Sequence, residues 1–166
     1  MFKLNLKKII VNFIIVLCIF LVDRFSKIYI LKISELQNIL DIYINPYLNF
    51  YLIWNKGIAF GLLSFNDVLI YNIVTSIIII ITAVVLIMLI KSEGLKKYSL
   101  LFVMGGSLGN LYDRIYYSAV PDFIDFHINN FHWFVFNVAD IFITFGIICL
   151  IFDEVFINNK SDEKDV

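Results

Sequence analysis

The segment VLIYNIVTSIIIIITAVVLIMLI, residues 68–90, decides how this chain folds. It contains no charged residue, and a helix of this length can cross the hydrocarbon core of a bilayer, which is about 30 Å thick and needs roughly 20 residues. Such a stretch is typical of a transmembrane helix. The chain is therefore predicted to be an integral membrane protein.

Composition extends this prediction to the whole chain. Of its 166 residues, 61% are hydrophobic, 17% are aromatic and only 16% are charged, and the mean hydropathy is +0.89. Soluble domains are about 45–50% apolar, so little of the chain is left for a separate soluble domain. The net charge of −1 gives no reason to expect a nucleic-acid partner. Cys18 and Cys149 lie in apolar runs, and their spacing fits neither a metal site nor a disulfide framework.

Three further apolar segments lead to a prediction of four transmembrane helices. The four spans are expected at about residues 9–31, 68–90, 97–116 and 134–156. They form a single integral-membrane domain over residues 1–158, followed by a disordered cytoplasmic tail at 159–166. The chain starts like a signal peptide, but Val22-Asp23-Arg24-Phe25 stands where a cleaved signal has small residues, so the first span is expected to remain.

The distribution of lysine sets the expected orientation. With four spans, both chain ends and the connection between the second and third spans share one side. That side carries most of the 13 basic residues, namely Lys3, Lys7, Lys8, Lys91, Lys96, Lys97, Lys160 and Lys164. The outer loops, residues 32–67 and 117–133, contain only Lys32 and Lys56. Because basic residues stay on the inner side, both termini are expected in the cytoplasm.

The first outer loop contains a β pattern. The aromatic run Leu48–Trp54 and the run Ile58–Leu63 flank Asn55-Lys56-Gly57, as two strands flank a tight turn. Aromatic side chains on such a hairpin suit the headgroup layer of a membrane. The expected fold class is an all-α membrane protein with four transmembrane helices and a small extracytoplasmic β-rich cradle.

Two carboxylates lie at the outer ends of apolar segments. Asp122 follows the third span, and Asp140 lies within the fourth. A carboxylate in hydrocarbon costs about 2.5–3.5 kcal/mol even on lenient scales, so two at one depth indicate a function. Neighbouring carboxylates that cannot both ionise freely perform the chemistry of aspartic proteases. The structural alternative is a pair of surface carboxylates at helix ends.

Other polar residues are expected near the same depth, and each also has a structural interpretation. Asp113 and Arg114 favour an ion pair that fixes the third helix, and Asp23 with Lys27 is an ordinary i, i+4 pair. By helical spacing, Asn110 shares a face with Asp113 and Arg114, and Asn137 shares a face with Asp140. Asn55 and Gly57 lie in the first outer loop and are equally typical of a turn.

Glycines and histidines also suggest structural roles. Gly105 and Gly109 predict close helix packing, because small residues let helix backbones approach. Asp125, His127 and His132 are interpreted as part of a wet loop. Their spacing matches no known zinc pattern, so no metal ligand is expected.

Five blocks of the sequence together resemble a known family. They are Val22-Asp23-Arg24-Phe25-Ser26-Lys27, Asn55-Lys56-Gly57-Ile58-Ala59-Phe60-Gly61, Gly105-Gly106-x-x-Gly109-Asn110-x-x-Asp113-Arg114, Asp122-Phe123 and Phe136-Asn137-Val138-Ala139-Asp140. In this order they resemble the signature blocks of lipoprotein signal peptidase, the bacterial type II signal peptidase. The length and the number of spans agree with that family.

The resemblance implies a multi-pass aspartic endopeptidase of the bacterial cell (inner) membrane, with its active site on the extracytoplasmic side. Such an enzyme removes the signal peptide from diacylglyceryl-modified prolipoproteins by cutting before the lipidated lipobox cysteine. Its partners would be these substrates and membrane lipids. A monomer without a cofactor is expected, and the peptide antibiotic globomycin should inhibit it.

The resemblance also assigns residues. The catalytic aspartates of the family fall on Asp122 and Asp140. The supporting and substrate-binding positions fall on Asp23, Lys27, Asn55, Gly57, Asn110, Asp113, Arg114, Asn137 and Ala139. Pro121 departs from the family, which usually has an aliphatic residue there. Proline fixes φ near −65° and stiffens the approach to Asp122 without replacing a functional group.

Two other functions compete with hydrolysis. A proton or cation transporter also uses intramembrane carboxylates, but residues 68–90 carry no charge and the polar residues gather on one side. A structural subunit of a membrane complex accounts for the glycines and aromatic residues, but not for the clustered aspartates and asparagines. The sequence therefore favours the peptidase.

Overall fold

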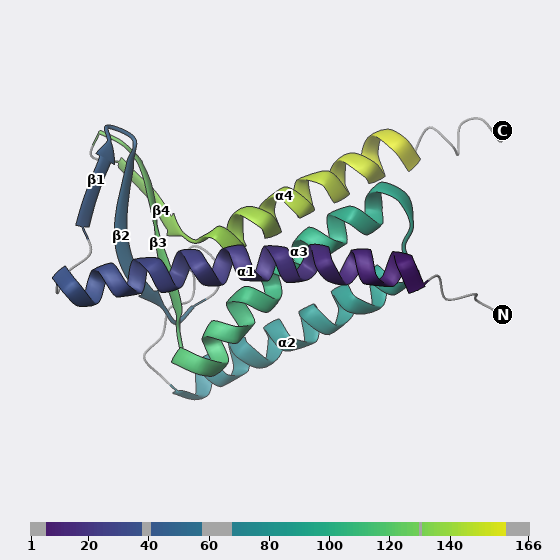
Figure 1. Ribbon diagram of the computed structural model, residues 1–166, viewed down its shortest axis with the longest axis horizontal. Coiled ribbons are helices and arrows are strands. Elements are labelled where there is room, and N and C mark those ends of the chain that lie inside the picture. Colours follow the sequence, from purple (N-terminus) through teal and green to yellow (C-terminus); the bar gives the residue numbers. More distant parts are fainter. Residues whose placement is uncertain (1–5, 38–40, 58–67, 130, 159–166) are drawn as a thin grey trace.

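The computed structural model describes residues 6–37, 41–57, 68–129 and 131–158, which form a helical bundle with a β-sheet at one end (Figure 1). The helices are α1 (Leu6–Gln37), α2 (Val68–Lys91), α3 (Gly94–Tyr117) and α4 (Val138–Phe152), and a π-helical segment η2 (Asp153–Asn158) continues α4. The strands are β1 (Asp41–Asn45), β2 (Leu48–Asn55), β3 (Val120–Ile128) and β4 (Phe131–Phe136). The predicted tail at 159–166 lies outside the described residues.

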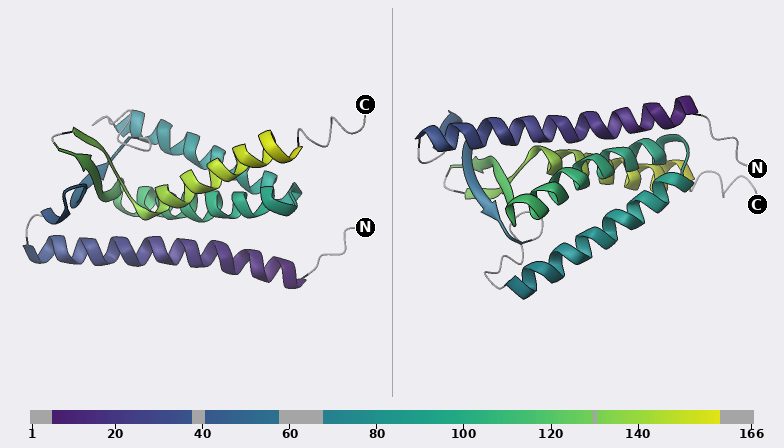
Figure 2. Two further views of the ribbon diagram at one scale, coloured as in Figure 1. Left: turned by 90° about the horizontal axis from the view of Figure 1, so that it is seen from above. Right: turned by 60° about the horizontal axis from the view of Figure 1, so that its bottom comes forward.

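Helix α3 lies at the centre of the bundle. Figure 2 shows α1 and α2 on opposite sides of it, while α4 runs along it. A Cβ atom at Gly105 would come within 2.7 Å of Ile19 in α1, and one at Gly109 within 2.6 Å of the Asp23 carboxylate. The predicted close packing at these two glycines is therefore confirmed, because a larger residue would force α1 away.

The outer faces of the helices are apolar. Two helical stretches, Leu6–Leu36 and Val68–Lys91, are long and apolar enough to cross a membrane. Helix α2 buries only Val74, Thr82 and Leu89, and the rest of its aliphatic surface faces outward. A helix that is hydrophobic all round and exposes this surface suits a lipid environment. The second predicted span, residues 68–90, matches α2.

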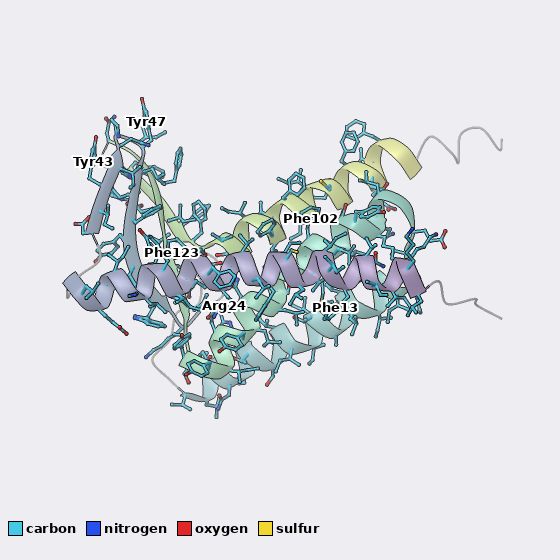
Figure 3. All side chains as sticks on the ribbon, viewed as in Figure 1. Phe13, Arg24, Tyr43, Tyr47, Phe102 and Phe123 are labelled. Carbon is cyan, nitrogen blue, oxygen red and sulfur yellow. The ribbon has the colours of Figure 1, made fainter. Side chains whose placement is uncertain are left out.

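The sheet is antiparallel with strand order β1-β2-β3-β4. It lies at one end of the helices, whereas α1 begins and α4 ends at the opposite end (Figure 1). The buried side chains of Phe123 and Ile30 join β3 to α1, and Figure 3 places Phe123 where the sheet meets the helices. Tyr43 and Tyr47 are exposed near the far tip of the sheet.

The sheet confirms that a β-rich element accompanies the helices, but it corrects the prediction that residues 117–133 form a loop. Much of residues 117–133 forms β3 and part of β4, so Asp125 and His127 are buried on a strand instead of lying in a wet loop. The fourth helix starts at Val138, later than the predicted 134, because Phe131–Phe136 pairs with β3. A short apolar run has no periodicity that separates a strand from the start of a helix.

The first strand of the predicted hairpin is confirmed. Leu48–Trp54 does form a strand, but its two neighbours are β1 and β3. The expected partner, Ile58–Leu63, lies outside the described residues. Strand β3 is distant in sequence from β2, and a local sequence pattern cannot predict pairing between distant strands.

Candidate active site

The N-terminus of α4 joins the two candidate carboxylates. Asn137 is the N-cap of this helix, and its side-chain oxygen accepts a hydrogen bond from the backbone N–H of Asp140 at 3.2 Å. The Asp140 carboxylate accepts the backbone N–H of Asn137 in return, also at 3.2 Å. The Asn137 Nδ2 donates to Asp122 Oδ1 at 2.6 Å. One capping residue therefore holds both carboxylates.

Asp122 is positioned by the pairing of β2 with β3. The register places Asn55 opposite Val120 and Ile53 opposite Asp122. The Asn55 Nδ2 donates to Asp122 Oδ2 at 2.8 Å, while the Asn55 oxygen accepts the Gly57 backbone N–H at 2.8 Å. Asp122 is only 2% exposed. Burial, aided by the nearby Asp140 carboxylate, raises the pKa of Asp122 to about 7.

Asp140 is held by a second asparagine. The Asn110 Nδ2 on α3 donates to Asp140 Oδ1 at 2.8 Å, and the Asp140 side chain is buried. Among the described residues, neither Asp122 nor Asp140 forms an ion pair. Their hydrogen-bond donors are amides. Two buried carboxylates without a paired cation are suited to sharing one proton.

A cluster of four charged side chains lies beside this pair and joins α1 to α3. Lys27 Nζ lies 2.9 Å from Asp23 Oδ1 and 2.7 Å from Asp113 Oδ2. Arg24 lies 3.0 Å from Asp23 and 2.5 Å from Asp113. Two cations thus balance two carboxylates in a buried position, which is the condition under which buried charges are tolerated. The predicted Asp23–Lys27 pair is confirmed.

The charged cluster also reaches the catalytic candidates. Lys27 Nζ donates to Asn110 Oδ1 at 2.9 Å, so its charge fixes the asparagine that holds Asp140. The backbone N–H of Ala139 donates to Asp23 Oδ1 at 3.0 Å. Since this N–H belongs to the first turn of α4, Asp23 anchors the helix that carries Asp140.

The predicted Asp113–Arg114 ion pair is wrong. Adjacent residues of a helix point in different directions. Asp113 therefore faces α1, while Arg114 faces the chain just after the C-terminal end of β2. The Arg114 guanidinium donates to the carbonyl oxygen of Gly57, and it lies over the Tyr71 ring at 5.9 Å. The Tyr71 hydroxyl donates to the Arg114 carbonyl at 2.8 Å. Arg114 therefore positions the segment after β2.

Sequence reasoning missed two residues of this site. Arg24 was part of a signature block but received no role, although it contacts both carboxylates of the charged cluster. An arginine inside an apolar span was itself a signal, because such a charge needs a partner. Tyr71 lies in an apolar segment, and nothing in its local sequence indicates that it contacts Arg114.

Comparisons with known proteins agree over nearly the whole chain. A sequence model of the family described as signal peptidase (SPase) II matches residues 15–156. A lipoprotein signal peptidase of Pelagibacter ubique (strain HTCC1062) is 52% identical over 164 residues, which cover 98% of this chain and 99% of that protein. A lipoprotein signal peptidase of Francisella tularensis subsp. novicida (strain U112) is 39% identical, covering 90% of this chain and 94% of its own length.

Two solved structures share the fold. One bacterial membrane enzyme is 27% identical with a TM-score of 0.68, and the match covers 87% of both chains. A second bacterial membrane enzyme is 26% identical with a TM-score of 0.68, covering 89% of this chain and 94% of its own. Together with the apolar helices, these matches show that the chain is a membrane protein with a β-sheet.

Proposed function

Since the chain belongs to the signal peptidase II family of aspartic peptidases, we propose that Asp122 and Asp140 are its catalytic pair. As a member of this family, the chain removes signal peptides from lipoprotein precursors. The observation that carries the proposal is a pair of buried carboxylates joined by Asn137 and contacted by amide donors. The bond that is cut is the one before the lipobox cysteine, after that cysteine has received its diacylglyceryl group.

The pair would act on a water molecule placed between the two carboxylates. One carboxylate accepts a proton from the water as it attacks the scissile carbonyl, and the protonated partner polarises that carbonyl. The proton then passes to the leaving amine. Because the two groups interact, they titrate as a pair, and neither residue has a fixed role as acid or base. Asn55, Asn110 and Asn137 keep the carboxylates in place during this exchange.

We further propose that α1, α2, α3 and α4 all cross the membrane, with both termini in the cytoplasm. Basic residues support this orientation, because Lys91 ends α2 and Lys96 and Lys97 start α3. That connection lies at the end of the bundle where α1 begins (Figure 1). The sheet and the catalytic pair would then lie on the extracytoplasmic side of the bacterial inner membrane. We expect a monomer whose apolar helix faces contact membrane lipids.

This orientation suits the substrate. A diacylglyceryl group anchors the lipobox cysteine at the membrane surface, so the bond before it lies near the headgroup layer. Asp122 stands at the junction of the sheet with the helices, and Asp140 lies in the first turn of α4. The side chain of Asn55 and the backbone N–H of Gly57 lie at and just after the end of β2, beside them. The reacting groups are thus expected at the depth of the scissile bond.

The test is a reaction with a defined substrate. Purified protein in detergent would be mixed with a prolipoprotein that carries the diacylglyceryl group and with the same precursor before lipidation. Mass spectrometry should find a new N-terminal lipidated cysteine only from the lipidated precursor. Cleavage at another bond, or equal cleavage of both precursors, would contradict the proposed specificity. Globomycin should block the reaction.

A further inference from the structure

A second cluster of titratable side chains lies on the β3–β4 hairpin, away from the catalytic pair. Asp125 and His127 lie on β3, two residues apart, so their side chains share one face of the strand. His132 on β4 is the cross-strand partner of His127. One ligand atom from each of these three residues can be chosen so that all three atoms lie within 4.8 Å of one another.

The distances within this cluster are close to those between the ligands of one metal ion. His132 Nδ1 lies 2.8 Å from Asp125 Oδ2, and His127 Nδ1 lies 3.5 Å from the same oxygen. The two imidazole rings are stacked with centroids 5.0 Å apart. Zinc holds nitrogen and oxygen ligands at about 2.0–2.2 Å, which separates tetrahedral ligand atoms by roughly 3.3 Å. Small rotations of the side chains would bring the three groups onto one ion.

Two buried polar atoms in the cluster are unsatisfied. Within the described part of the chain, Asp125 Oδ1 and His127 Nδ1 have no hydrogen-bond partner. Both residues are more than nine-tenths buried, with exposures of 4% and 8%. Leaving such a buried atom unpaired is unfavourable, because it has lost its hydrogen bonds to water. A cation bound between Asp125 and the two histidines would satisfy His127 Nδ1, which a simple Asp125–His132 hydrogen bond leaves unpaired.

We propose that Asp125, His127 and His132 bind a divalent transition-metal ion of the zinc type. Two imidazoles and a carboxylate are a ligand set that suits Zn²⁺. His132 is exposed, so the ion can enter from solvent and keep a water molecule as a fourth ligand. The ion ties β4 to β3 and thereby stabilises the strand that carries Asp122. The spacing of these three residues along the sequence matches no known zinc motif. The pairing of β3 with β4 is what brings His132 next to His127.

This metal site does not take part in peptide hydrolysis. The register shifts insert the extra residue into β2 and β4, so β3 itself alternates regularly. Asp122 and Asp125 are three residues apart and therefore point to opposite faces of β3. A chelator should lower thermal stability, but it should leave the cleavage rate unchanged at temperatures where the hairpin stays folded.

The test uses the full chain without a histidine tag, after dialysis against a chelator. Zn²⁺ is titrated by calorimetry, and Co²⁺ is added separately to record its visible absorption. One equivalent of Zn²⁺ should bind with a raised Tm, and Co²⁺ should give the absorption of a four-coordinate site. Losing only a residue that hydrogen-bonds a metal ligand costs roughly 10–100-fold in affinity, so losing a ligand itself should cost at least about 100-fold.

His132→Asn and Asp125→Asn are the informative variants. His132→Asn keeps a hydrogen-bond donor near Asp125 but loses the imidazole ligand. Asp41→Asn changes an exposed carboxylate on β1 of the same sheet and serves as the matched control. Zinc affinity should fall in the first two variants and remain in the control. Absence of one-to-one binding in the parent protein, or equal binding in all four proteins, would overturn the proposal.

Discussion

Two buried clusters of carboxylates lie side by side, and they differ in what neutralises them. Asp23 and Asp113 contact Arg24 and Lys27, so two negative charges meet two positive ones. Asp122 and Asp140 contact the amides of three asparagines, Asn55, Asn110 and Asn137. Carboxylates paired with cations can stay ionised and hold helices together. Carboxylates supported by neutral amides can exchange a proton, which is what hydrolysis needs.

The clusters are also mechanically connected. Lys27 contacts Asn110, and Asn110 contacts Asp140. Asp23 binds the backbone N–H of Ala139, next to Asp140 in α4. The charged cluster is thus expected to position the catalytic pair. Variants in the two clusters should therefore differ in kind: in the charged cluster stability and activity are lost together, and in the catalytic pair mainly the chemistry is lost.

The largest effect on stability is expected for Asp113→Ala. Removing this carboxylate leaves Arg24 and Lys27 buried with one negative partner, and breaking a buried pair costs about 3–5 kcal/mol. Chemical unfolding in detergent should show this loss together with lost activity. Asp41→Ala, at an exposed carboxylate, should be nearly neutral. Unchanged stability with complete loss of activity would move Asp113 into the catalytic set.

The second prediction concerns how the free energy of unfolding depends on pH through Asp122. Because the pKa of Asp122 is raised from 3.8 to about 7 in the folded state, the folded protein binds a proton more tightly than the unfolded chain. The resulting stabilisation is complete below about pH 4 and is lost as pH rises to about 7, by roughly 4 kcal/mol at most. The free energy of unfolding of Asp122→Asn should fall less steeply with pH than that of wild type, because only one carboxylate of the pair remains.

The comparison is made between pH 4.5 and 8. The difference between wild type and Asp122→Asn should change steadily up to about pH 7 and then level off. Asp41→Asn controls for general effects of losing a carboxylate. If the curves of Asp122→Asn and wild type run parallel over this range, Asp122 does not hold a proton in the folded protein.

Asn55→Ala should reduce turnover by about 100-fold, because it frees Asp122 to move out of alignment. The family resemblance places Asn55 among the supporting and substrate-binding residues, and in the structure its amide donates to the Asp122 carboxylate. Losing this hydrogen bond also raises the pKa of Asp122, since the bond favours the ionised form. The pH profile of turnover should shift upward. Asn49→Ala on the same strand should do neither.

The smallest effect is expected for Trp54→Ala. Trp54 lies on β2, is 43% exposed and packs against Tyr117 with ring centroids 5.4 Å apart. As a surface contact for substrate it should affect binding, so KM should rise a few-fold while kcat stays unchanged. Single-turnover rates at saturating substrate distinguish this case. A rate as low as that of Asn55→Ala would place Trp54 in the catalytic apparatus.

Local patterns predicted the parts of this molecule that local forces determine. The apolar run at 68–90 became α2, Asp23 and Lys27 formed their i, i+4 pair, and Gly105 and Gly109 face α1 at close range. The strands β3 and β4 escaped prediction because a short apolar run between helices fits either state. The polar residues of the site were identified by type and by their expected common depth.

Contacts between distant segments were not predictable in the same way. Asp113 was expected to pair with its neighbour, but the helix turns it toward Lys27, far away in sequence. Asn55 reaches Asp122 only through the β2–β3 register. His127 meets His132 for the same reason, through β3 and β4. In each case the contact partner of the side chain is determined by the packing or pairing of segments that are distant in sequence.

The most direct test of the account is the cleavage rate of Asp122→Asn and Asp140→Asn, measured in single turnover with a diacylglyceryl-modified prolipoprotein. Each change keeps the shape of the side chain but removes half of the acid–base pair. Each variant should lose at least about 100-fold in rate while remaining folded in the membrane. A variant that keeps a tenth or more of the wild-type rate would contradict the assignment of that aspartate to the catalytic pair.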